Sequence, residues 1–113
     1  RAVDDPRVEV RRAGAFVAEP SAISRTDSEG FRVLERTLRS LAPDVLVAPY
    51  LVVVVSDARH YAGLTDTVLR FLPLPMEPDD LARIHGTDER VSVADYEAAI
   101  RIYRQLILNA AGG

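Results

Sequence analysis

The most apolar stretch of the chain covers residues 45–55 and contains four consecutive valines, residues 52–55. A strand with one wet face alternates apolar and polar residues, whereas a strand buried on both faces is continuously apolar. The pattern therefore predicts a central strand of a parallel sheet. Asp57, Arg59 and His60 follow it directly. In open α/β sheets, ligands bind at this carboxyl end of the strands.

An amphipathic helix is predicted before this strand. It can be capped by Asp27 or Ser28, and Pro43 stops it. Its side chains fall into a polar face and an apolar stripe, the pattern of a helix that packs on a core. The apolar stripe consists of Phe31, Leu34, Leu38 and Leu41.

A second amphipathic helix is predicted at the end of the chain. Ser92 and Asp95 resemble a capping box with Asp in place of Glu, and Gly112 and Gly113 end the helix. Its apolar face is broad, which predicts that much of the helix is buried. This face consists of Tyr96, Ala99, Ile100, Tyr103, Leu106, Ile107 and Ala110.

Shorter elements complete the expected architecture. Residues 7–11 alternate charged and apolar side chains like a half-exposed strand, and residues 68–74 form a second short strand. Pro78 introduces a short helix over residues 79–84. Helices and strands thus combine into a predicted α/β fold, with helices packed on a mostly parallel sheet.

Composition narrows the possible partners. At 113 residues the chain can form one domain with one modest core. Its 14 basic and 17 acidic residues give a net charge of −3, which argues against nucleic acid or an anionic membrane as the main partner. Cysteine is absent, which excludes thiolate metal ligands and thiol nucleophiles. No apolar segment is long enough to span a membrane.

The composition suggests a type of source organism but not a cellular compartment. All basic residues are arginines, as in proteins from GC-rich coding sequences, so we expect a soluble protein of a GC-rich bacterium. Its compartment stays open between the cytoplasm, the periplasm and the exterior. The first residues include neither methionine nor an apolar signal core, so we expect the natural amino terminus to lie upstream.

Two groups of ionisable residues are candidates for chemistry: residues 57–60 and residues 85–89. Imidazole and carboxylate groups suit zinc, and a catalytic zinc usually takes three protein ligands and a water. Spacing alone leaves alternatives open, because the chain contains neither His-x-His nor His-Glu-x-x-His. His60 can be a metal ligand or an ordinary histidine at a strand end, and His85 can be a residue that stabilises helix-terminal carbonyls.

Several stretches together carry a resemblance to a known family. They are residues 47–52, residues 56–61, residues 71–74, residues 84–91 and a final helix from Ser92. In order and spacing they resemble the carboxyl-terminal part of the di-zinc aminoacylase and carboxypeptidase family. Within it, the chain is most similar to the carboxypeptidase S-like and N-acyl-amino-acid amidohydrolase branch.

The resemblance implies a division into two parts. Residues 1–13 would be the end of a lid domain that makes the dimer contact, with the return strand, and residues 14–113 the carboxyl-terminal part of a catalytic domain. The complete protein is expected to be a homodimer through its lid. Its complete catalytic domain would bind two zinc ions and cleave amide bonds of peptides or N-acyl amino acids that carry a free carboxylate.

The resemblance also implies roles for individual residues. His60 matches the family's last metal-binding histidine, and Asp57 and Arg59 match its neighbours. His85 and Glu89 belong to a stretch that lies near the substrate in the family. The remaining metal ligands and the general base are expected upstream, so no catalytic residue is assigned here. The isolated chain is expected to be inactive.

Two departures from the family pattern matter, and the first of them, together with the missing upstream ligands, favours an alternative. Val54 and Val55 stand where the family usually has two small residues, commonly glycines, which let the backbone approach a ligand closely. Asp88 stands where an asparagine is usual and adds negative charge. The alternative is a degenerate, non-catalytic α/β module that serves packing or interaction.

Overall fold

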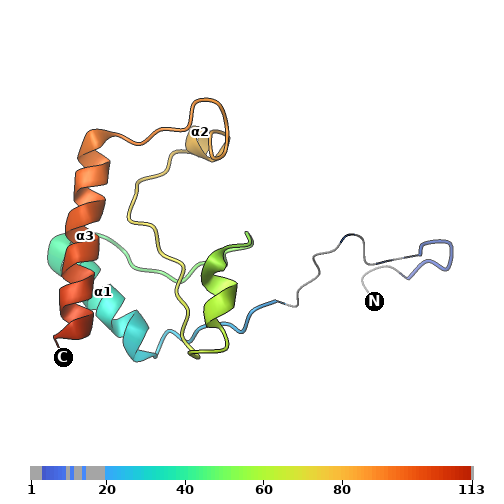
Figure 1. Cartoon of the computed structure of the whole chain (residues 1–113), viewed down its shortest axis with the longest axis horizontal. Coiled ribbons are helices and arrows are strands. Elements are labelled where there is room, and N and C mark those ends of the chain that lie inside the picture. The colour runs from blue at the N-terminus through green and yellow to red at the C-terminus, as the bar shows by residue number, and fades with distance from the viewer. Residues whose placement is uncertain (1–3, 10, 12–13, 15–19, 113) are drawn as a thin grey trace.

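The computed structural model describes residues 4–9, 11, 14 and 20–112. In chain order, the elements are α1 (Glu29–Leu41), the 3-10 helix η1 (Asp57–Tyr61), α2 (Pro78–Leu81) and α3 (Val93–Ala111). Helices α1 and α3 lie against each other, and irregular segments connect them through η1 and α2 (Figure 1). None of the described helices combines the length and apolar character needed to cross a membrane.

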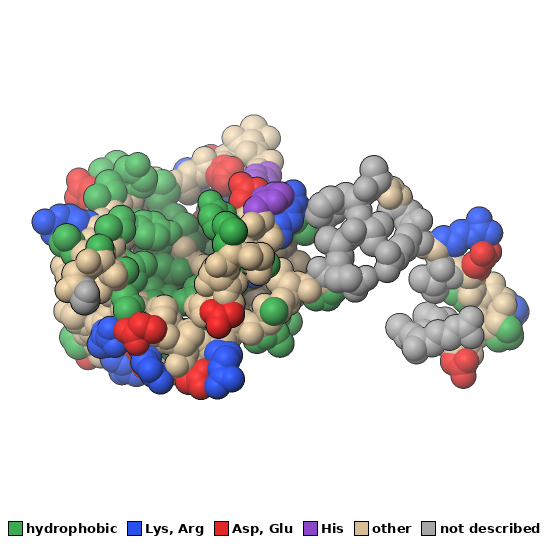
Figure 2. All heavy atoms as spheres, turned by 60° about the horizontal axis from the view of Figure 1, so that its bottom comes forward, with side chains coloured by type: hydrophobic (Ala, Val, Ile, Leu, Met, Phe, Trp, Pro, Cys, Tyr) green, Lys and Arg blue, Asp and Glu red, His purple; other side chains and the backbone are tan. Residues whose placement is uncertain are grey.

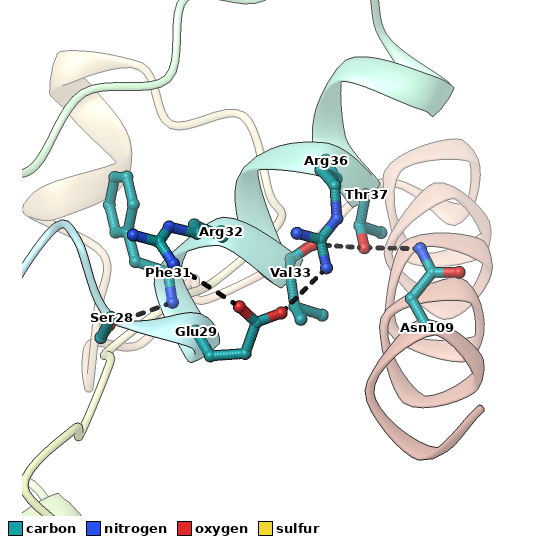
Figure 3. A network of polar contacts seen from close by, with 8 residues as sticks. All are labelled: Ser28, Glu29, Phe31, Arg32, Val33, Arg36, Thr37 and Asn109. Atoms are coloured by element: carbon teal, nitrogen blue, oxygen red, sulfur yellow. Dashed lines mark hydrogen bonds and ion pairs between the residues drawn. The ribbon is translucent and has the colours of Figure 1, made fainter. Parts of the chain in front are cut away.

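The core lies between α1 and α3, the only two helices in contact within the described part of the chain. Helix α1 contributes Val33, Leu34 and Thr37, and α3 contributes Ala99. Thr37 is fully buried, and its hydroxyl donates to the carbonyl of Val33 at 2.8 Å. The same hydroxyl accepts from Nδ2 of Asn109 at 2.8 Å (Figure 3). A polar group satisfied on both sides can be buried at little cost.

Both long helices begin at a serine, as the sequence predicts. Oγ of Ser28 accepts from the N–H of Phe31 at 3.3 Å, and Oγ of Ser92 accepts from the N–H of Asp95 at 3.0 Å. Each bond satisfies a backbone donor that the first helical turn cannot pair internally. The hydroxyl of Ser92 also donates to Oδ2 of Asp95 at 2.5 Å. Helix α3 ends with Gly112 at its C-cap, which confirms that prediction too.

The predicted α/β fold with a parallel sheet is wrong, because the described residues contain no strand. Residues 46–55 make no backbone hydrogen bond to other described residues, and the side chains of Val53 and Val55 are 82% and 69% exposed. A run of β-branched residues favours extended backbone, but a strand also requires a neighbouring strand as hydrogen-bond partner. No described segment supplies that neighbour.

The two shorter strands are also absent from the residues that the structure describes. Residues 68–74 are irregular, and so are the described members of the segment 7–11, whose Val10 lies outside the described residues. The short helix begins at Pro78 as predicted, but it ends at Leu81 and does not reach Ile84. The fold class is therefore helical, with long connections in place of the expected sheet.

The apolar faces of the helices are less buried than predicted. On α1 the buried stripe passes through Thr37, and the predicted member Leu41 is 46% exposed. On α3, Tyr96, Ile100 and Ile107 are more than half exposed. Figure 2 shows hydrophobic side chains gathered over much of one face of the molecule. Helix α1 covers one side of α3 and Phe71 contacts Tyr103, so Tyr96, Ile100 and Ile107 stay largely exposed in the described structure.

The segment 67–71 is fixed to distant parts of the chain by side-chain contacts. Oγ of Ser24 donates to the carbonyl of Val68 and accepts from its N–H, both at 2.8 Å. The hydroxyl of Tyr103 donates to the carbonyl of Phe71 at 2.9 Å, and the two rings meet edge to face at 6.2 Å. These contacts attach an irregular segment to α3 and to the stretch that precedes α1.

Candidate functional site

Helix η1 carries the first group of predicted site residues. Asp57, Arg59 and His60 lie within this five-residue 3-10 helix, and Ser56 precedes it. The N–H of Arg59 donates to the carbonyl of Ser56 at 3.3 Å. The hydroxyl of Ser56 does not cap the helix, because it accepts from Nε of Arg70 at 3.2 Å. These residues thus lie in a short helical turn after the valine run, where the sequence predicts the end of a strand that the described structure lacks.

His60 is exposed and is paired with its neighbour. Nε of Arg59 donates to Nε2 of His60 at 3.2 Å. In this contact the lone pair of Nε2 is engaged by Arg59. A metal at Nε2 needs the same lone pair that Arg59 uses. Metal binding through Nε2 therefore requires the guanidinium to move aside.

His85 and Glu89 meet in a tight turn after α2. The N–H of His85 donates to Oε2 of Glu89 at 3.2 Å. His85 has φ of 60°, the left-handed region that non-glycine residues rarely adopt. Asp88 lies in the same stretch and forms an ion pair with Arg90 at 2.8 Å. The acid that departs from the family pattern is thus neutralised locally.

The structure does not bring the two predicted groups together. Within the described residues, no hydrogen bond or ion pair joins residues 57–60 to residues 85–89, and η1 makes no contact with α2. Figure 1 shows η1 and the turn after α2 on separate parts of the chain. The assignment of Asp57, Arg59, His85 and Glu89 to one substrate site remains a prediction.

The described residues do not include a complete set of zinc ligands. A catalytic zinc usually takes three protein ligands. Across residues 4–9, 11, 14 and 20–112, no three His, Asp or Glu side chains are grouped so that they could hold a metal. His60 is thus a single candidate ligand. The described residues alone do not fit a zinc ion.

The structure contains an open pocket that the sequence does not predict. It has a volume of about 480 Å³ and lies between residues 21–28, the segment around Ala58 and Ala62, and residues 65–70. Five of the side chains that line it carry hydroxyl groups: Ser21, Ser24, Ser28, Thr65 and Thr67. The contacts that form it join residues far apart in sequence, and no local pattern indicates such pairing.

The two arginines at this pocket differ in their hydrogen-bond partners. Arg25 donates to Asp27 through Nε at 2.7 Å and Nη2 at 2.5 Å. This pairing lowers the pKa of the Asp27 carboxyl and raises the pKa of Arg25, to which the negative charge of Asp66 adds. Arg70 instead contacts hydroxyls: Nε donates to Ser56, and Nη2 lies 3.5 Å from Oγ of Ser21.

Comparison with known proteins identifies the class of molecule. Peptidase family M20/M25/M40 matches residues 7–109, which is most of the chain. The chain belongs to peptidase family M20/M25/M40, as the resemblance in the sequence predicts.

Curated relatives extend the comparison. A probable carboxypeptidase S-like protein 2 of Dictyostelium discoideum is 38% identical over 109 residues, which cover 96% of this chain and 21% of that protein. An N-fatty-acyl-amino acid synthase/hydrolase of Mus musculus is 38% identical over 111 residues, with 96% and 22% covered. The human protein of that name is 35% identical over 109 residues, with 96% and 22% covered.

The chain corresponds to only a part of each relative. The chain spans about a fifth of the length of the curated relatives it matches. No solved structure matches the chain. Family membership is therefore established for this segment, and the activity of a complete protein is a separate question.

Proposed function

We propose that the chain is the carboxyl-terminal part of a zinc-dependent hydrolase that cleaves amide bonds of peptides or N-acyl amino acids. The observation that carries the proposal is the family match over residues 7–109. The names of the relatives, carboxypeptidase S-like and N-fatty-acyl-amino acid hydrolase, support the substrate class. In this proposal, residues 14–113 belong to the catalytic domain and residues 1–13 end a lid domain.

His60 is proposed as one metal ligand. It is exposed at the surface of η1, so a metal held by other parts of a complete domain could reach it. Zinc would supply a Lewis acid at the amide carbonyl. Because the described residues offer no complete ligand set, we assign the other ligands of the two zinc ions to sequence beyond this chain.

Asp57, Arg59, His85 and Glu89 are proposed to lie near the substrate. Arg59 is the cation of this group, and a guanidinium suits a substrate carboxylate. The backbone N–H of His85 donates to the carboxylate of Glu89, so the two residues belong to one turn. We further propose a homodimer formed through the lid domain and no nucleic-acid partner, in line with the net charge of −3.

The test uses a full-length protein that contains this chain. Zinc content is measured by elemental analysis, and hydrolysis is measured with N-acyl amino acids. We expect bound zinc and activity, and His60→Gln should lower both. His85→Gln is the matched control: it should reduce hydrolysis without releasing zinc. A full-length protein that is metal-free and inactive would contradict the proposal.

A second candidate is a non-catalytic module for packing or interaction. The Val54–Val55 pair favours it, because valine cannot adopt the backbone range open to the glycines usual at this place. In the full-length protein, replacing both valines with glycine should raise hydrolysis if the side chains obstruct the site. Equal activity before and after the replacement excludes obstruction by the valines as the cause of low hydrolysis.

A further inference from the structure

Arg70 lies where three segments of the chain meet. Its Nε donates to Ser56, which precedes η1, and its Nη2 lies 3.5 Å from Oγ of Ser21. The segment that carries Arg70 is held in place two residues earlier, because Ser24 bonds both backbone groups of Val68. The guanidinium is therefore positioned by side chains from two separate stretches, and it lines the open pocket.

The charge of Arg70 is not compensated by any described residue. Both of its partners are neutral hydroxyls, and it makes no ion pair within the described part of the chain. A guanidinium carries five N–H donors in a planar fork, so the two hydroxyls leave donors available. Planar forks of this kind recognise carboxylates through two parallel hydrogen bonds.

The acids at the pocket are engaged elsewhere. Asp27 is held by both donor groups of Arg25, and the charge of Asp66 also acts on Arg25. Thr67 donates to Asp66 through its hydroxyl at 3.4 Å. Of the two arginines that line the pocket, Arg25 therefore interacts with acids, whereas Arg70 contacts only two hydroxyls among the described residues.

We infer that Arg70, with the hydroxyl of Ser21, forms a binding site for the carboxylate group of a small organic acid. One unpaired guanidinium balances a single negative charge, whereas Asp27 and Asp66 disfavour a doubly charged phosphate. Ser21 accepts from Arg70 at 3.5 Å, so its O–H can still donate to a ligand, whereas the O–H groups of Ser24, Thr65 and Thr67 already donate within the chain. The site requires no metal and no hydrolysis, so it is tested independently of the proposed function.

The experiment uses the 113-residue chain labelled with ¹⁵N. N-acetylglycine is titrated while the Nε–H resonance of Arg70 is followed by NMR, and N-acetylglycinamide serves as the neutral analogue. We expect a saturable shift with the acid and none with the amide. Equal shifts with both compounds would show that the carboxylate is not recognised. Inorganic phosphate that binds as tightly as the acid would contradict the assignment to carboxylates.

Variants make the inference specific to Arg70. In backbone amide spectra, Arg70→Gln should weaken binding of N-acetylglycine by about tenfold or more, as expected for loss of a charge-assisted pair. Arg70→Lys keeps the charge without the fork and should weaken binding less. Arg101→Gln removes an exposed arginine of α3 as the matched control and should change nothing. Asp66→Asn should tighten binding, and equal affinity for all four variants would overturn the inference.

Discussion

The hydroxyl of Thr37 and the side-chain amide of Asn109 form a hydrogen bond of 2.8 Å that crosses from α1 to α3, 72 residues apart. Thr37 is fully buried, so the bond lies inside the small core. In Figure 3 the two side chains point toward each other across the gap between the helices. The bond therefore links α1, the first helix of the described chain, to α3, the last one.

We expect the Thr37–Asn109 pair to stabilise the fold by about 1 kcal/mol. Thr37→Val keeps the shape of the side chain and removes the hydroxyl, so the variant should unfold at lower urea concentration. A double-mutant cycle with Asn109→Ala should give a coupling energy of about 0.5–1.5 kcal/mol. The pair Gln105–Asn109, exposed and within α3, is the control and should couple by about 0.2–0.5 kcal/mol. Additive effects of Thr37→Val and Asn109→Ala would contradict the expectation.

Gly30 allows the segment 67–69 to approach the start of α1. A Cβ at this position would lie 3.3 Å from Cγ2 of Thr67, which is a tight contact. Alanine is favoured over glycine in a helix by about 1 kcal/mol, so contact and propensity oppose each other. We expect Gly30→Ala alone to change the melting temperature little. In a Thr67→Ser background, which lacks the methyl group, the same change should stabilise by about 1 kcal/mol. An equal effect in both backgrounds would exclude the contact as the cause.

Ser24 satisfies two backbone groups of Val68 with a single hydroxyl. Ser24→Ala leaves both groups without that partner, and we expect a loss of about 1–3 kcal/mol. Hydrogen exchange of the Val68 amide should accelerate. Ser21→Ala is the matched control, since Ser21 has a single contact at 3.5 Å and should leave this amide unchanged. Unaltered exchange at Val68 in Ser24→Ala would contradict the role of the hydroxyl.

Asp80 gives the start of α2 a dependence on pH. Its carboxylate accepts from the N–H of Glu77 at 2.9 Å and from Arg83 at 2.7 Å. The bond from the Glu77 backbone is the main cause that lowers the pKa of Asp80, and Arg83 adds to it. A lowered folded-state pKa means that the stabilisation is present above the unfolded value of about 3.9 and is lost as pH falls through the folded value.

We therefore expect the ¹³Cγ resonance of Asp80 to titrate below the ordinary aspartate range. Exchange of the Glu77 amide should accelerate over the same pH interval. In Asp80→Asn this acceleration should disappear, because the side chain no longer titrates. A titration midpoint at or above about 3.9 is the result that contradicts this expectation.

Local sequence signals predicted the ends of the helices well. Ser28 and Ser92 each cap a helix through a bond to a residue three positions later, and Gly112 follows α3. Such contacts depend on residues close in sequence, so a short pattern contains all the information that they require. The same holds for the turn at Pro78, where proline fits a first helical position.

Contacts between distant residues were not predictable in this way. The valine run indicates a preference for extended backbone, but whether a strand forms depends on a neighbour that the run itself does not specify. Likewise, the partners of Arg70 lie 14 and 49 residues away. Thr37 is polar, and its burial depends in part on a partner, Asn109, that lies 72 residues away. The family was identified from the order of several motifs, which is information that single periodicities lack.

The left-handed backbone of His85 has an evolutionary consequence. At φ of 60°, a side chain with a Cβ raises the energy of the turn by roughly 1–2 kcal/mol relative to glycine. Folding alone therefore favours replacement of His85 by glycine. If natural variants of this chain keep histidine there, selection for the imidazole has outweighed the tendency of the turn to relax.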